Sequence, residues 1–189
     1  MSKKILFLTG TRADFGKIKS LIQILEAYPE FEPFIFVTGM HLQKEYGYTL
    51  LEVERCGFTN IHTFENHTHE TTMDLTLAKT IKGLSAYVKQ CEPDMIVIHG
   101  DRVEALAGAI VGSLNNILVS HIEGGEVSGT IDELIRHSTS KMSHVHFVSN
   151  KQAKKRLIQM GELENAIFTI GSPDVDIMFS TTLPNLETA

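Results

Sequence analysis

The strongest constraint on the fold lies in residues 94–123, where two short apolar runs flank a segment rich in small residues. The runs cover residues 95–98 and 117–119. Strands of a parallel sheet are buried on both faces, so they read as continuous apolar runs. Ligands of such sheets bind beyond the carboxyl ends of the strands. Asp101 and Glu123 come shortly after the two runs, so we expect both carboxylates at the edge where chemistry takes place.

Apolar strands and amphipathic helices alternate through the rest of the chain as well. We expect further strands at residues 4–8, 34–37, 60–64, 145–148 and 166–170, and helices at 14–28, 42–56, 73–91, 131–142 and 151–160. This alternation predicts right-handed βαβ crossovers and an α/β, Rossmann-like parallel sheet of about seven strands with helices on both faces. The pattern stops after Gly171, so we expect one domain over residues 1–171. Residues 172–189 would be an interdomain linker or the start of another domain.

Composition excludes several classes of protein. A chain of 189 residues with 42% hydrophobic residues is typical of a globular domain, and a net charge of −6 argues against nucleic-acid binding. The sequence contains no run of about 18 apolar residues, so we expect no membrane span. The N-terminal residues lead directly into a predicted strand and do not have the pattern of a signal peptide. Cys56 and Cys91 lack metal-ligand spacing, so we interpret them as reduced thiols of a cytoplasmic protein.

The turn after the first strand, residues 10–17, contains Gly10, Arg12 and Lys17. Backbone N–H groups at a helix start, together with a cation, form a natural anion site. The glycine spacing matches neither the Walker loop nor the dinucleotide fingerprint. A turn glycine with solvated charges is the alternative. We favour a phosphate contact because Arg12 follows a sheet strand at its carboxyl end.

Three acidic residues, Asp101, Glu123 and Asp132, follow strands or begin the next helix. A lone acid at such a place is usually a helix cap or a salt-bridge partner. Three acids on neighbouring crossovers can shift one another's pKa values and so supply both an acid and a base. The spacing therefore suggests acid–base chemistry at this edge of the sheet.

Several histidines lie near the same strands, and they could suggest a metal ion. Metal sites need a compact set of ligands, such as two histidines one helical turn apart. That spacing is missing here, so we expect hydrogen-bonding roles and no metal site. The histidines in question are His99, His121, His137, His144 and His146.

Five segments together resemble the UDP-N-acetylglucosamine 2-epimerase family over about residues 4–178. They are Gly10-Thr11-Arg12, Thr38-Gly39-Met40-His41, His99-Gly100-Asp101-Arg102, His121-Ile122-Glu123-Gly124-Gly125 and Ile131-Asp132-Glu133-Leu134-Ile135-Arg136-His137. Residues 10–17 and the double glycine resemble the hydrolysing branch, which releases UDP and a free 2-epimerised sugar such as N-acetylmannosamine for sialic-acid-type pathways. The non-hydrolysing branch usually has Pro-Glu in place of Ala13-Asp14 and Gln in place of Met40.

The resemblance implies one half of a two-domain, GT-B-like enzyme, whose second domain contributes most uridine and diphosphate contacts and a catalytic histidine. It implies anti elimination of UDP across C1–C2, followed by addition of water with inversion at C2. No cofactor is needed, since these steps cause no net oxidation. Asp101, Glu123 and Asp132 match the catalytic acids of the family, with their individual roles left open. The expected substrate contacts are Gly10, Arg12, Lys17, His99, Arg102, Gly124 and Arg136.

We therefore expect a UDP-sugar substrate, no nucleic-acid or membrane partner, and a homo-oligomer when the enzyme is full length, with the isolated chain inactive. The sugar stays open between N-acetylglucosamine and a 2,4-diacetamido-6-deoxy sugar. The alternatives are a GT-B glycosyltransferase, which would use a single base and a sugar acceptor, and a non-catalytic nucleotide-sugar-binding module. A nicotinamide dehydrogenase is disfavoured because no Gly-x-Gly-x-x-Gly follows the first strand.

Overall fold

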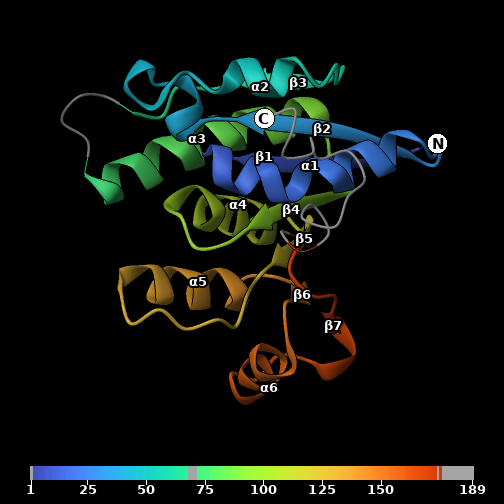
Figure 1. Ribbon diagram of the computed structural model, residues 1–189, viewed down its shortest axis with the longest axis vertical. Coiled ribbons are helices and arrows are strands. Elements are labelled where there is room, and N and C mark those ends of the chain that lie inside the picture. Colours follow the sequence, from blue (N-terminus) through green and yellow to red (C-terminus); the bar gives the residue numbers. More distant parts are fainter. Residues whose placement is uncertain (1, 68–71, 174, 176–189) are drawn as a thin grey trace, which may run out of the picture.

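The computed structural model describes residues 2–67, 72–173 and 175, and it contains a seven-stranded sheet in which every pair of neighbours is parallel (Figure 1). The sheet order is β3-β2-β1-β4-β5-β6-β7. The strands are β1 (Lys3–Thr9), β2 (Phe31–Val37), β3 (Ile61–Thr63), β4 (Met95–His99), β5 (Leu118–Ile122), β6 (Val145–Val148) and β7 (Ile167–Thr169). The predicted α/β fold with a parallel sheet of seven strands is confirmed.

Helices connect the strands and cover both faces of the sheet. The α-helices are α1 (Arg12–Glu26), α2 (Leu50–Glu54), α3 (Met73–Cys91), α4 (Val103–Leu114), α5 (Ile131–Lys141) and α6 (Lys151–Gln159). Short 3₁₀ helices complete the connections: η1 (Gly39–Leu42), η2 (Lys44–Tyr46) and η3 (Glu164–Ala166). Within the part of the chain that the structure describes, no helix is both long and apolar enough to cross a bilayer.

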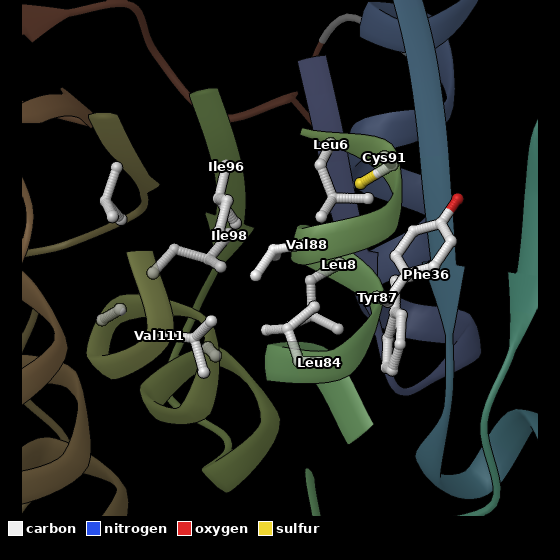
Figure 2. Packing of buried hydrophobic residues seen from close by; sticks show 13 residues of the cluster. Leu6, Leu8, Phe36, Leu84, Tyr87, Val88, Cys91, Ile96, Ile98 and Val111 are labelled. Atoms are coloured by element: carbon white, nitrogen blue, oxygen red, sulfur yellow. The ribbon is translucent and has the colours of Figure 1, made fainter. Parts of the chain in front are cut away.

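Alternation along the central strands divides the core into two layers. Successive side chains of a strand point to opposite faces, so Leu6 and Leu8 pack on one side of β1 while Ile5 and Phe7 pack on the other. Figure 2 shows the first layer, where α3 and α4 pack on the strands. The second layer packs under α1 and α2. Burying an aliphatic or aromatic side chain contributes about 1.5–3 kcal/mol, so these two layers hold the sheet and its turns in place.

Small residues let α4 lie close to the sheet. A Cβ atom added at Gly112 would stand 2.3 Å from Cγ2 of Val119, and one at Gly108 would stand 2.5 Å from Cγ2 of Ile98. Real Cβ atoms are essentially never that close to another heavy atom. The segment rich in small residues between the two apolar runs thus forms α4, and its close packing on the sheet requires those small residues.

The segment after β2 differs from the single helix predicted over residues 42–56. It forms η1, η2 and the five-residue α2 instead. The break falls at Gly47 and Tyr48, whose φ angles are 85° and 47°. Two successive residues in the left-handed region cannot continue a right-handed helix.

The sheet order places a topological switch between β1 and β4. The chain moves from β1 outward to β2 and β3, then returns to β4 and builds the other half of the sheet. Crossovers leave a crevice at such a switch, at the carboxyl ends of the strands. The turns after β1, β4 and β5 therefore meet at one place.

Candidate active site

A pocket of about 330 Å³ opens at this switch, between the turns that follow β1, β4 and β5. Its size lies at the lower end of the range for small-molecule sites, about 300–1,000 Å³. The lining residues are Thr11, Ala13, Asp14, Lys17, His99, Gly100, Asp101, Arg102, Glu123, Glu126 and Arg136. The expectation that Asp101 and Glu123 lie on adjacent loops at one edge holds.

Glu123 accepts hydrogen bonds at both of its carboxylate oxygens. Its Oε2 accepts hydrogen bonds from Nζ of Lys17 at 2.7 Å and from Nε2 of His99 at 3.0 Å. Its Oε1 accepts one from the Ser172 hydroxyl at 2.8 Å. Burial by itself would raise the pKa of Glu123, but the hydrogen bonds from His99 and Lys17 outweigh burial and lower the pKa to about 2. Glu123 is therefore ionised at neutral pH.

The backbone of Glu123 is also unusual. Its φ angle is 60°, in the left-handed region that residues other than glycine rarely adopt. Its N–H donates to the carbonyl of Phe147 at 2.8 Å, which fixes the turn against the end of β6. Strain of this kind costs about 1–3 kcal/mol and gathers at functional sites. Here the turn directs the carboxylate toward Lys17 and His99.

Asp101 lies in the turn between β4 and α4, and it pairs with a cation on another element. Nη2 of Arg136, on α5, donates to Oδ2 of Asp101. The side chains of Arg136 and Asp101 are 12% and 27% exposed. The pocket thus contains two separately paired carboxylates, one bound to Arg136 and the other to Lys17 and His99.

His121, which lies on β5, supports the Asp101 turn from below. It is completely buried, its Nε2 bonds to the carbonyl of Gly100 at 2.7 Å, and its Nδ1 bonds to the hydroxyl of Ser140 at 3.0 Å. Burial lowers the pKa of His121 to about 3, so the ring is neutral at physiological pH. Because a carbonyl only accepts, Nε2 carries the proton and Nδ1 accepts from Ser140.

Gly124 follows Glu123, and the hydrogen-bonded pair of His121 and Ser140 leaves no room for a larger residue at this position. A Cβ atom there would stand 2.7 Å from Oγ of Ser140 and 2.8 Å from Nδ1 of His121. Gly124 does not line the pocket, so its visible effect is to let the Glu123 turn approach α5.

The backbone N–H groups of the turn after β1 are hydrogen-bonded to a carboxylate of the same turn, that of Asp14. Asp14 accepts hydrogen bonds from the backbone N–H groups of Gly10 at 3.0 Å and of Thr11 at 3.1 Å. Thr11 in turn caps α1 by accepting from the N–H of Asp14 at 3.2 Å, which completes a capping box. The backbone amides that were predicted to contact a phosphate are thus hydrogen-bonded to Asp14. Lys17, the cation at the end of residues 10–17, lines the pocket.

Two expected site residues point elsewhere in this structure. Arg12 is 74% exposed and its Nε lies 3.2 Å from Oε2 of Glu52, outside the pocket lining. Asp132 is exposed in the first turn of α5, where its Oδ2 accepts from the hydroxyl of Thr130 at 3.1 Å. Asp132 and Arg136 are four residues apart on α5, so they share one face of that helix.

Other pocket residues were absent from the predicted set. Asp14 and Glu126 line the pocket, and Ser172 contacts Glu123 from beyond β7. A capping-box pattern, Thr followed three residues later by Asp, was available to identify Asp14 as a turn residue. Ser172 had only its place after a strand as a signal. Among residues 2–67, 72–173 and 175, no group of three or more His, Cys, Asp or Glu is arranged to hold a metal ion.

The fold and the position of the pocket together define the structural class of the domain. A parallel sheet with its pocket at the β1/β4 switch is the arrangement of Rossmann-like domains, which bind their ligands at this crevice. The family assignment follows from the sequence: residues 23–189 match the family model described as UDP-N-acetylglucosamine 2-epimerase. The chain belongs to this family.

Individual relatives agree with this assignment. The chain is 54% identical to a UDP-N-acetylglucosamine 2-epimerase from Neisseria meningitidis serogroup B, over 98% of this chain and 49% of the relative. It is 40% identical to a UDP-N,N'-diacetylbacillosamine 2-epimerase (hydrolyzing) from Legionella pneumophila, over 93% of this chain and 48% of the relative.

A solved structure agrees as well. The crystal structure of the Methanocaldococcus jannaschii UDP-GlcNAc 2-epimerase in complex with UDP-GlcNAc and UDP superimposes with a TM-score of 0.78 at 27% identity, covering 89% of this chain and 46% of that one. The chain thus spans about half the length of the relatives it matches.

Proposed function

We propose that this chain is the first half of a hydrolysing UDP-sugar 2-epimerase, which converts UDP-N-acetylglucosamine into UDP and free N-acetylmannosamine for sialic-acid-type biosynthesis. The observation that carries the proposal is that two carboxylates, Asp101 and Glu123, line one pocket and that each forms an ion pair with a different cation. Two carboxylates in different environments can serve an acid and a base role at the same pH.

The reaction has two steps that these groups can support. In the first, a base removes the C2 proton, the C1–C2 double bond forms and the C1–O bond to UDP breaks. In the second, water adds across the double bond, with hydroxyl at C1 and a proton on the other face of C2. Glu123 is held ionised, so it suits the role of proton acceptor and not of proton donor. Cations such as Lys17 stabilise the charge that develops on the departing diphosphate.

Lys17 links substrate binding to the basicity of Glu123. A carboxylate with a pKa of about 2 is a weak base, because a general base works best with a pKa near the working pH. A diphosphate bound near Lys17 would compete with Glu123 for this ammonium group. Weakening that ion pair raises the pKa of Glu123 and makes it a better base.

The other expected site residues remain part of the proposal on the strength of the resemblance. Asp132 is the third carboxylate, on the face of α5 that also carries Arg136. Arg12 would contact the diphosphate, with His99, Arg102 and the glycines Gly10 and Gly124 shaping the substrate site. We also propose, on the same ground, that the full-length enzyme is a cytoplasmic homo-oligomer that uses no cofactor.

The choice of the hydrolysing branch has two supports. Residues 10–17 and the double glycine after Glu123 fit it, and the Legionella relative is named as hydrolyzing. That relative also keeps a second substrate open, a UDP-2,4-diacetamido-6-deoxy sugar of the bacillosamine type.

The experiment incubates the full-length enzyme, meaning this chain joined to the second half that its relatives have, with each UDP-sugar in deuterated water and without an acceptor. We expect free UDP and a free 2-epimer that carries deuterium at C2, because the C2 proton comes from solvent. A UDP-linked epimer would instead indicate the non-hydrolysing branch. Turnover only with an added sugar acceptor would indicate a glycosyltransferase, and tight binding without turnover would indicate a binding module.

A further inference from the structure

Ser172 joins the pocket to the segment by which the chain leaves the sheet. It follows β7 at the carboxyl edge, and its hydroxyl donates to Oε1 of Glu123 at 2.8 Å. The other oxygen, Oε2, is bound by Lys17 and His99. Both oxygens of Glu123 are therefore anchored, from three separate elements of the fold.

This arrangement restricts the carboxylate more than charge pairing alone would. The terminal torsion of glutamate is broad, and rotation about it moves both carboxylate oxygens, so the two bonds to Oε2 already limit this rotation. The bond from Ser172 to Oε1 adds a restraint on the other side of the torsion axis. A hydrogen bond to the charged form also favours that form, so Ser172 affects the basicity of Glu123 as well as its orientation.

We propose that Ser172 is a positioning residue that acts through Glu123 and makes the orientation and basicity of this carboxylate depend on the exit segment after β7. The inference rests on the proposed function. Loss of the bond loosens the orientation of the carboxylate and weakens the stabilisation of its charged form.

The contact itself is tested without any activity, in the 189-residue chain. Urea unfolding at pH 7 is measured for Ser172→Ala, Glu123→Ala and the double variant. Ser172→Ala is expected to lower the folding equilibrium constant about tenfold in the wild-type background, as for a hydrogen bond to a charged group. In the Glu123→Ala background the same change should lower it less than about twofold. Equal effects in both backgrounds would overturn the proposal.

The positioning role is tested by turnover of the full-length enzyme. Ser172→Ala should lower kcat about tenfold and leave KM within about twofold, because the lost orientation of a reacting group outweighs the gain in basicity of Glu123 and the bond does not hold substrate. Ser172→Thr keeps the hydroxyl and should restore kcat to within about twofold. The matched control is Ser113→Ala, which removes a hydroxyl bonded to the carbonyl of Met142, away from the pocket lining, and should change stability but not kcat.

These outcomes separate the two proposals. An unchanged kcat in Ser172→Ala, or a Ser172→Thr variant as slow as Ser172→Ala, overturns the positioning role while the epimerase function stands. Absence of UDP release by the unmodified full-length enzyme refutes the proposed function, and the unfolding experiment then still decides whether Ser172 and Glu123 are coupled.

Discussion

Replacing Glu123 by Gln tests how much the pocket's ion pairs contribute to stability. Gln keeps the size of the side chain and removes its charge, so Lys17 and His99 lose a charged partner. The pKa of Glu123 is lowered from an ordinary value of 4.5 to about 2. At about 1.4 kcal/mol per pH unit, this gap corresponds to about 3 kcal/mol of unfolding free energy. The Glu123 side chain is only 16% exposed, so screening by solvent reduces this figure little.

The sign of the pH dependence follows from the direction of the change. A carboxylate whose pKa is lower in the folded state stabilises the fold fully above its unfolded pKa, here about 4.5, and this stabilisation is lost as the pH falls toward about 2. The stability gap between wild type and Glu123→Gln should therefore be about 3 kcal/mol at pH 7, and it should narrow steadily below about pH 4.5.

The assay is urea unfolding of the 189-residue chain, followed by circular dichroism at pH 7, 5, 4 and 3. Glu126→Gln is the matched control, because Glu126 lines the same pocket but accepts a hydrogen bond from the neutral amide of Asn150 at an exposed position. It should cost less than about 0.5 kcal/mol. A gap for Glu123→Gln below about 1 kcal/mol at pH 7, or one that stays constant from pH 7 to pH 3, would refute this account of the ion pairs.

Three further predictions address turnover and packing. In the full-length enzyme, Asp101→Asn should lower the rate of UDP release at least about a hundredfold, as for a general acid–base group; steady-state kinetics with near-normal turnover would remove Asp101 from the chemistry. The 189-residue chain alone should release no UDP from UDP-N-acetylglucosamine, because it spans about half the length of its relatives and the proposed cleft would then be incomplete and open to water; a coupled UDP assay that detects turnover would contradict this. Gly112→Ala should destabilise the chain by about 1–3 kcal/mol, because its Cβ would overlap Val119. Gly16→Ala, in a helix with nothing within 4 Å of the new Cβ, should stabilise by about 0.5–1 kcal/mol; thermal melts in which the two variants behave alike would contradict the packing argument.

The fold was predictable because its signals are local and strong. Apolar runs mark the central strands, and the periodic segment before Pro93 gives α3 the same bounds, Met73–Cys91, as predicted. The prediction from sequence was wrong over residues 42–56, where the backbone conformation of two residues ends the helix. Gly47 could be recognised as a helix breaker, but the left-handed conformation of Tyr48 beside it has no signal in the residue type.

The pocket was predictable only in part. The order of the strands determines which turns lie together, but it does not determine the direction in which each side chain of a turn points. Asp101 and Glu123 meet as expected, since parallel strands end at one edge. Arg12 was expected near them, yet it pairs with Glu52 from the segment that was mispredicted as one helix. Ser172 lies 49 residues from Glu123 in the sequence, and a contact at that separation depends on tertiary packing that no local pattern shows.

The charges that line the pocket are unevenly divided. Four acids, Asp14, Asp101, Glu123 and Glu126, face three bases, Lys17, Arg102 and Arg136. Asp14 also occupies the amides at the start of α1. A nucleoside diphosphate is itself strongly anionic, so this wall alone offers it no net attraction. If the proposed function holds, cations outside this pocket lining, including those in the part of the relatives that this chain does not cover, would supply most of the charge that holds the phosphates. A nucleotide titration of the 189-residue chain would then respond to ionic strength far less than one of the full-length enzyme.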